Sequence, residues 1–127
     1  MPTKVVGLDA CAVKVIDKAR VNAAKAQLLP ENELDELTQL FKLLGDTTRA
    51  RLLYALLEAG ELCVCDLSAA TATPETNVSH ALRLLRTAGI VKARRDGRMM
   101  FYNLDDAHVR LLLDVSREHL RHAGAIR

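Results

Sequence analysis

The feature that most constrains this chain is a succession of short amphipathic repeats, each ended by a glycine. Over residues 31–44 and again over 47–59, leucines recur every three or four positions, which is the spacing of one face of an α-helix. Gly45 and Gly60 follow the repeats where helices typically stop, and Asp46 is placed to cap the second one. The pattern predicts two helices that pack through their leucines.

Two further helices are expected at the ends of the chain. Residues from about 10 to 29 contain no Gly or Pro and are followed by Pro30, so they suit a helix. The last segment begins with Asp105 or Asp106 as a cap and has an apolar face that ends before Gly124. Paired with each other, these N- and C-terminal helices predict a homodimer interface.

The stretches CDLSAATA and TPETNVSHALRLLRTAG predict two short helices around a tight break. Thr73 is the expected N-cap of the second helix, Pro74 its first residue, and Ala88 and Gly89 mark its end. This is helix–turn–helix spacing, which would place the second helix in a DNA major groove. The predicted base contacts are Glu75, Thr76, Asn77, Ser79 and His80, and the predicted phosphate or guanine contacts are Arg83 and Arg86.

A basic β-hairpin is predicted directly after that helix. IVKARRDGRMMFYNL contains two β-type runs joined at Asp96-Gly97, a dipeptide that favours a type I′ turn. An isolated basic turn is as often a solvated loop, but after a recognition helix it predicts a DNA-contacting wing. Its proposed DNA contacts are Arg94, Arg95 and Arg98. The expected fold is mainly α with a small β-hairpin wing, a winged helix–turn–helix.

Length and composition limit the remaining possibilities. The 127 residues predict a single winged helix–turn–helix domain, made of an N-terminal extension (1–30), the helix–turn–helix with its wing (31–104) and a C-terminal dimerisation helix (105–127). No apolar run is long enough for a membrane span, and no secretory leader is recognisable, so a cytoplasmic protein is expected. Two Phe, two Tyr and no Trp argue for duplex rather than single-stranded nucleic acid.

Three cysteines, an odd number, favour a metal or redox role over a disulfide framework. Cys63 and Cys65 stand two apart, so both can reach one ion only at a loosened helix start, where the helix dipole would lower the thiol pKa. Cys11, from the same or the partner subunit, would complete three thiolates, which favour soft or large ions such as Cd²⁺, Pb²⁺ or As(III). Small buried hydrophobes are the competing interpretation of the cysteine pair.

A second set of metal-binding side chains lies in the last predicted helix: Asp106, His108, His119 and His122. His119 and His122 share a helix face, but His108 lies three turns away, roughly 16 Å along the axis. An antiparallel pairing of this helix with its copy would bring the two halves together. Three nitrogens and one oxygen would then form a tetrahedral site suited to Zn²⁺.

Taken together, LGDTTRARLLYALL, ELCVCDL, TNVSHALRLLRTAGIV and RRDGRMMFYNL resemble the ArsR/SmtB family of metal-responsive repressors, over roughly residues 34–122. The resemblance implies metal-ligand roles for Cys11, Cys63 and Cys65, as in CadC-like cadmium and lead sensors. It implies a zinc site like that of SmtB-like sensors at the Asp106 and histidine set. Gly7 stands where CadC-like sensors have a companion to Cys11, so three thiolates are expected, and Ser68 stands where arsenic sensors have a third cysteine.

The resemblance also implies derepression: a metal-free dimer binds a palindromic double-stranded operator, and Cd(II) or Pb(II), with Zn(II) as a further candidate, releases it to derepress metal efflux or resistance genes. We expect metal binding at the thiolate site to control DNA affinity, since this site adjoins the helix–turn–helix. The alternatives are an arsenite- or zinc-responsive repressor, and a repressor that senses thiol oxidation. A metal-buffering or enzymatic protein is a third class, but sites saturated by protein ligands leave no open position for water. No small organic substrate is expected.

Overall fold

The computed structural model describes residues 9–124, which divide into two compact units at Asp35 and Glu36. The described part of the first unit contains helix α1 (Lys18–Ala26). Asp17 caps α1 by accepting a hydrogen bond from the Arg20 backbone N–H at 3.2 Å. The prediction of a helix from about residue 10 is therefore wrong at its start, because the only side-chain cap is Asp17 and the β-branched residues before it favour extended backbone.

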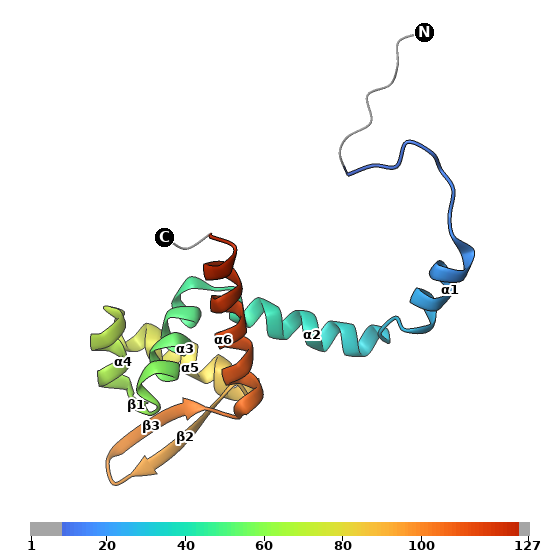
Figure 1. Ribbon diagram of the computed structural model, residues 1–127. Coiled ribbons are helices and arrows are strands. Elements are labelled where there is room, and N and C mark those ends of the chain that lie inside the picture. Colours follow the sequence, from blue (N-terminus) through green and yellow to red (C-terminus); the bar gives the residue numbers. More distant parts are fainter. Residues whose placement is uncertain (1–8, 125–127) are drawn as a thin grey trace. The chain divides into compact units, whose positions relative to one another are not determined.

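The second unit holds the remaining elements, and its first helix begins just before the boundary. The helices are α2 (Glu31–Leu44), α3 (Thr47–Ala59), α4 (Val64–Thr71), α5 (Glu75–Thr87) and α6 (Ala107–His122), and the strands are β1 (Leu62–Cys63), β2 (Val91–Asp96) and β3 (Met99–Leu104) (Figure 1). The starts of α3 and α6 follow from capping: Asp46 accepts from the Arg49 N–H at 2.9 Å, and Asp106 from the Val109 N–H at 3.1 Å. The cap at Asp46 was predicted from the sequence, and of the two candidates at the start of α6, Asp105 and Asp106, the structure shows Asp106.

The core lies where α3, α4, α5 and α6 meet the sheet. Its residues are almost all aliphatic, so burial of apolar side chains is the main source of its stability. The buried members are Leu52, Leu53, Leu56, Leu67, Val78, Ala81, Leu82, Leu85, Ile90, Val91, Leu104 and Leu113. The predicted leucine packing is confirmed for α3.

The turn between α4 and α5 is built by threonines and a left-handed residue. Ala72 has φ 51°, and the Thr73 hydroxyl donates to the Thr71 carbonyl at 3.1 Å. Because that hydroxyl is used within the turn, Thr73 does not cap α5; Pro74 takes the N-cap position and Glu75 is the first helical residue. The helix–turn–helix is thus confirmed, with its second helix starting one residue later than predicted.

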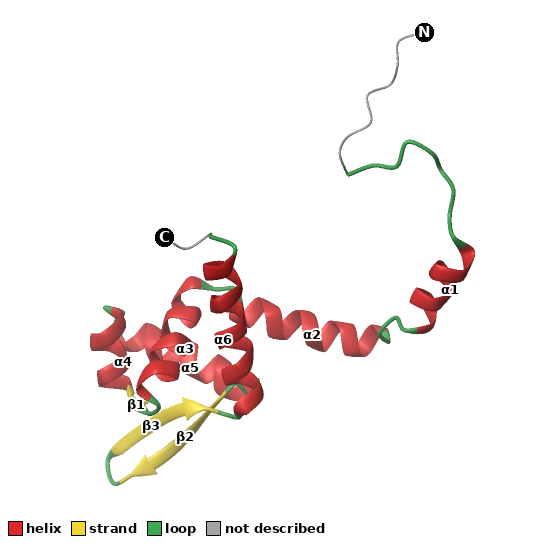
Figure 2. Cartoon of the chain, in the orientation of Figure 1, coloured by secondary structure: helices red, strands yellow, loops and turns green. Residues whose placement is uncertain are grey.

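The sheet has three antiparallel strands in the order β1-β3-β2 (Figure 2). The sequence pattern predicted the hairpin, but not β1, which is only two residues long. Asp96 pairs with Met99, so the turn residues are Gly97 and Arg98. Gly97 has φ 60° and Arg98 is not among the residues of positive φ, which is the type II′ pattern. The predicted type I′ turn at Asp96-Gly97 is therefore wrong, because the register shifts the turn by one residue.

Helix α6 contacts the core through only part of its apolar surface. Leu113 is buried, and its backbone carbonyl accepts a hydrogen bond from the Tyr54 hydroxyl of α3 at 2.8 Å. Leu111 and Val115 remain 61% and 55% exposed, as does Phe41 of α2 at 58%. Within residues 9–124, none of the helices has the length and apolar character needed to cross a membrane.

Candidate functional site

Helix α5 separates its buried and exposed residues cleanly. Val78, Leu82 and Leu85 point into the core, so the opposite face of the helix is left to solvent. All seven side chains predicted to contact DNA from this helix are exposed: Glu75, Thr76, Asn77, Ser79, His80, Arg83 and Arg86. His80 lines surface hollows on both sides of the helix, one shared with Ser79 and the other with Asn77. A rigidly held helix thus presents a row of hydrogen-bonding groups and two cations.

The three predicted wing arginines differ in their surroundings. Arg95 and Arg98 are exposed at the end of the hairpin. Arg94 instead directs its guanidinium onto the protein: it donates to Glu61 from Nε at 3.2 Å and from a terminal nitrogen at 2.7 Å, and it stacks over the Phe101 ring at 5.0 Å. Arg95 and Arg98 are therefore free to meet phosphate, whereas Arg94 is engaged.

The two cysteines of ELCVCDL lie in different environments. Cys63 ends β1, is the N-cap residue of α4 and is 5% exposed. Cys65, in the first turn of α4, is exposed, and its thiol donates to Glu75 Oε1 at 3.1 Å. The predicted loosened helix start is matched by the strand-to-helix junction between the two residues. Cys65 is joined to the first residue of α5.

The acid–base state of Cys65 differs from the prediction. The hydrogen bond to Glu75 raises the pKa of the Cys65 thiol, and the negative charge of that carboxylate raises it further. Helix-dipole stabilisation of the thiolate was expected to lower this pKa, and at Cys65 the nearby carboxylate outweighs it. A metal ion binding Cys65 must therefore displace the proton that this thiol shares with Glu75.

The other positions of the thiolate hypothesis are residues 11, 68 and 7. Cys11 is exposed in the first unit, ahead of α1 and outside any helix. Ser68, at the position of the arsenic sensors' third cysteine, donates its hydroxyl to the Thr73 carbonyl and so belongs to the α4–α5 turn. Gly7 lies outside the described residues.

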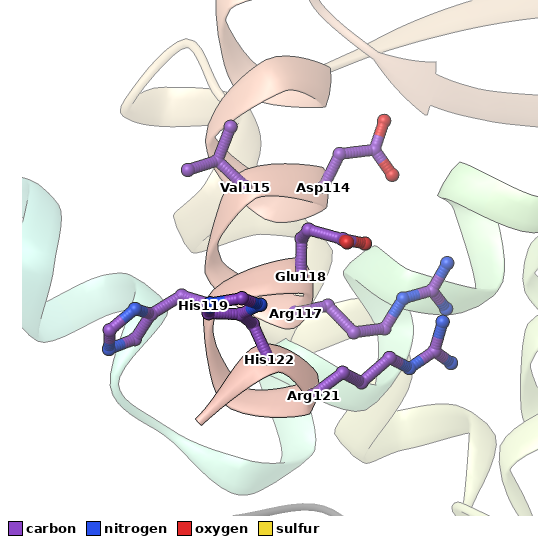
Figure 3. Close-up of a pocket in the computed structure, with 7 residues that line it drawn as sticks. All are labelled: Asp114, Val115, Arg117, Glu118, His119, Arg121 and His122. Carbon is purple, nitrogen blue, oxygen red and sulfur yellow. The ribbon is translucent and has the colours of Figure 1, made fainter. Parts of the chain in front are cut away.

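The C-terminal set is divided between the two ends of α6. Asp106 Oδ2 lies 3.6 Å from His108 Nδ1, and the backbone hydrogen bond from Val109 is the main cause of the lowered pKa of Asp106. His119 and His122 both lie in the last turn of α6, where they line the surface pocket drawn in Figure 3. One copy of the helix therefore keeps the two halves apart, as its length requires.

No cluster of three or more His, Cys, Asp or Glu side chains able to hold a metal ion occurs among residues 9–124. Each predicted ligand set is incomplete in one copy of the chain. The thiolate set is represented by Cys63 and Cys65, and the C-terminal set is divided into Asp106 with His108 and His119 with His122. Soft sulfur donors and imidazoles are suitable for the expected ions, but completing either site needs residues from elsewhere.

Two residues with a role at this site were not singled out from the sequence. The Glu61 carboxylate accepts two hydrogen bonds from the Arg94 guanidinium, and Asn103 Nδ2 donates to the same carboxylate at 3.5 Å. The sequence shows opposite charges at residues 61 and 94, but nothing in it indicates that they pair, because β1 was not predicted. The short strand is what brings the two together.

Comparison with known proteins agrees with this geometry. Residues 46–93 match the family described as bacterial regulatory protein, arsR family. A cadmium resistance transcriptional regulatory protein CadC homolog of Staphylococcus aureus is 40% identical over 118 residues, which is 93% of this chain and 97% of that protein.

Solved structures agree as well. The AntR antimony-specific transcriptional repressor superposes with a TM-score of 0.70 at 35% identity, covering 79% of this chain and 90% of that one. A homodimeric winged helix–turn–helix DNA-binding domain from Mycobacterium bovis, described as a possible ArsR-family regulator, gives 0.64 at 28% identity, covering 76% and 94%.

The fold and the exposed face of α5 define a winged helix–turn–helix DNA-binding regulator. The chain belongs to the ArsR/SmtB family of metal-responsive bacterial transcriptional regulators. The resemblance drawn from the sequence is thereby confirmed, as is the prediction that the chain is not an enzyme.

Proposed function

We propose that this protein is a homodimeric repressor whose metal-free form binds a palindromic operator and whose Cd(II)- or Pb(II)-bound form releases it, derepressing metal efflux or resistance genes. The observation that carries the proposal is the Cys65–Glu75 hydrogen bond of 3.1 Å. It joins a thiol of the candidate metal site to the first residue of the helix that faces DNA. Metal binding at the Cys65 sulfur would therefore directly affect Glu75, at the start of the DNA-facing helix α5.

DNA contact is assigned to the exposed face of α5 and the end of the wing. Asn77, Ser79 and His80 are placed to read base edges, because short polar side chains on a groove-facing helix can reach them. Arg83, Arg86, Arg95 and Arg98 supply phosphate contacts, with Glu75 and Thr76 at the entry to the groove.

Dimerisation is supported by apolar surface that one copy does not cover. Leu111 and Val115 of α6 and Phe41 of α2 are more than half exposed. Large apolar side chains left exposed on two helices favour a protein–protein interface there. The homodimeric Mycobacterium bovis domain offers a precedent at 28% identity. A two-fold axis would also place two α5 helices on successive major grooves.

The metal ligands are assigned to both predicted sets. Cys63 and Cys65, completed by Cys11 of the same or the partner subunit, bind Cd(II) or Pb(II), since thiolates prefer soft ions. The CadC homolog of Staphylococcus aureus, named for cadmium resistance, supports this choice. Asp106 and His108 of one subunit with His119 and His122 of the other bind Zn(II). Such a regulator would act in the cytoplasm, where DNA is accessible.

Release follows if the ion favours a dimer geometry in which the two α5 helices no longer match successive grooves. Binding at Cys65 removes the proton that this thiol donates to Glu75, so a contact at the start of α5 is lost. Coupling of about 1–3 kcal/mol, equivalent to roughly 5–150-fold in DNA affinity, is enough for such a switch.

Selection from random-sequence duplexes tests the DNA-binding half of the proposal. Metal-free protein should enrich two-fold symmetric sites with half-sites about one helical turn apart, roughly 10 base pairs. His80→Ala should change the preferred bases. Arg95→Gln should weaken binding to all sequences alike. It should also reduce the slope of log affinity against log salt concentration by about one. Failure to enrich any sequence, or enrichment of sites without symmetry, contradicts the proposal.

A further inference from the structure

The outer face of the sheet carries a side-chain cluster that joins the residue before β1 to side chains of β2 and β3. Glu61, just before β1, accepts both arms of the Arg94 guanidinium from β2, at 3.2 and 2.7 Å, and Asn103 Nδ2 from β3, at 3.5 Å. The Arg94 guanidinium also lies 5.0 Å from the centroid of Phe101 in β3. A planar guanidinium held by a two-pronged hydrogen bond and an aromatic face has little freedom to rotate.

This cluster adjoins β1, the strand that carries Cys63. In the register, Cys63 stands opposite Phe101, and Phe101 stands opposite Arg94. Residues opposite one another in antiparallel strands project from the same face, so the thiol, the ring and the guanidinium form one row across the sheet. Glu61 lies two residues before Cys63 and therefore faces the same side.

Backbone pairing alone attaches β1 weakly to the wing. Only Leu62 and Cys63 pair with β3. The Glu61–Arg94 pair adds a second attachment, this one directly to β2.

We propose that the Glu61–Arg94 pair is the mechanical link that transmits a change at Cys63 to the wing, so that Arg94 acts as a positioning residue and not as a phosphate contact. The proposal rests on the proposed function for its metal and its DNA. A metal ion that draws Cys63 toward other ligands displaces β1. Because Glu61 is fixed to Arg94, β2 and the arginine-bearing turn move with it.

The matched pair of variants is Glu61→Gln and Glu58→Gln. Each removes the charge from a glutamate that accepts hydrogen bonds from an arginine, but the partner of Glu58 is Arg117 of α6 and not an arginine of the wing. Arg94→Lys is the second test, since lysine keeps the positive charge and loses the two-pronged geometry. For each protein, the ratio of operator affinity without and with Cd²⁺ is measured alongside sulfur-to-cadmium absorption.

The link predicts that Glu61→Gln and Arg94→Lys bind Cd²⁺ with the wild-type absorption, while the affinity ratio falls by about fivefold or more in both. The ratio should stay at the wild-type value in Glu58→Gln. The double variant should be no worse than either single one, because both remove the same link. An unchanged ratio in Glu61→Gln, or a ratio that falls equally in Glu58→Gln, overturns the proposal.

A second readout needs no DNA and so separates this proposal from the repressor function. Cd²⁺ added to wild-type protein should shift the backbone amide resonances of Gly97 and Arg98, and the shifts should be lost in Glu61→Gln. If wild-type protein shows the shifts but keeps its operator, the link stands and the proposed function fails. Wing resonances that respond equally in both proteins overturn the link.

Discussion

Cys65→Ser is expected to abolish release of the operator by Cd²⁺ while the metal-free protein keeps its DNA affinity. The wild-type loss of affinity on metal binding, expected at roughly 5–150-fold, should shrink to less than about twofold. Serine is a poor ligand for soft ions, so the thiolate set loses a member. Its hydroxyl can still donate to Glu75, so the contact at the start of α5 is preserved. Fluorescence anisotropy of a labelled operator duplex measures both states.

The choice of Cys65 over Cys63 follows from exposure. Cys65 is exposed, whereas Cys63 is 5% exposed, and a serine hydroxyl buried there without a partner would cost about 1–3 kcal/mol of stability. His122→Gln is the matched control at the other candidate site. It should leave Cd²⁺ release unchanged. Release that survives in Cys65→Ser and disappears in His122→Gln would assign regulation to α6.

Leu82→Ala should strongly destabilise the protein. Leu82 is 0% exposed and packs in the core on the side of α5 opposite the DNA-facing residues. Leucine-to-alanine changes at such sites cost about 2–5 kcal/mol. That is a large share of the roughly 5–15 kcal/mol that holds a domain folded. Urea unfolding at a fixed protein concentration measures the loss, since subunit association makes apparent stability depend on concentration.

Leu84→Ala is the control for that loss, because it makes the same substitution on the same helix. Leu84 is 37% exposed, and leucine and alanine differ little in helix propensity. Its cost should stay below about 1 kcal/mol. Equal destabilisation by the two variants would contradict the assignment of Leu82 to the core and Leu84 to the surface.

Most of the fold could be predicted because its signals are local. Leucine periodicity, Gly45, Gly60 and the caps Asp46 and Asp106 each act within a few residues, and the structure agrees with all of them. The short strand β1 could not be predicted, since two residues carry no alternation. The predicted start of α1 is wrong because residues 10–17 contain no Gly or Pro to rule out a helix, while the first side-chain cap is Asp17.

The candidate site was harder to predict because its determinants lie far apart in the chain. The pKa of Cys65 depends on Glu75, ten residues away, and the engagement of Arg94 depends on Glu61, thirty-three residues away. Neither pair is visible until α4, α5 and the sheet are placed. Spacing along the chain indicated the candidate residues, but contacts between elements determine which arginine is engaged and which carboxylate accepts from the Cys65 thiol.

The central claim is that a metal ion bound by the cysteines releases DNA. Cd²⁺ titrated into the protein bound to its selected operator, with sulfur-to-cadmium absorption and duplex anisotropy recorded on the same sample, tests it most directly. The account predicts that the absorption rises and the duplex is released over the same range of added metal. A complete sulfur band with the duplex still bound, or release by Zn²⁺ with no sulfur band, would contradict it.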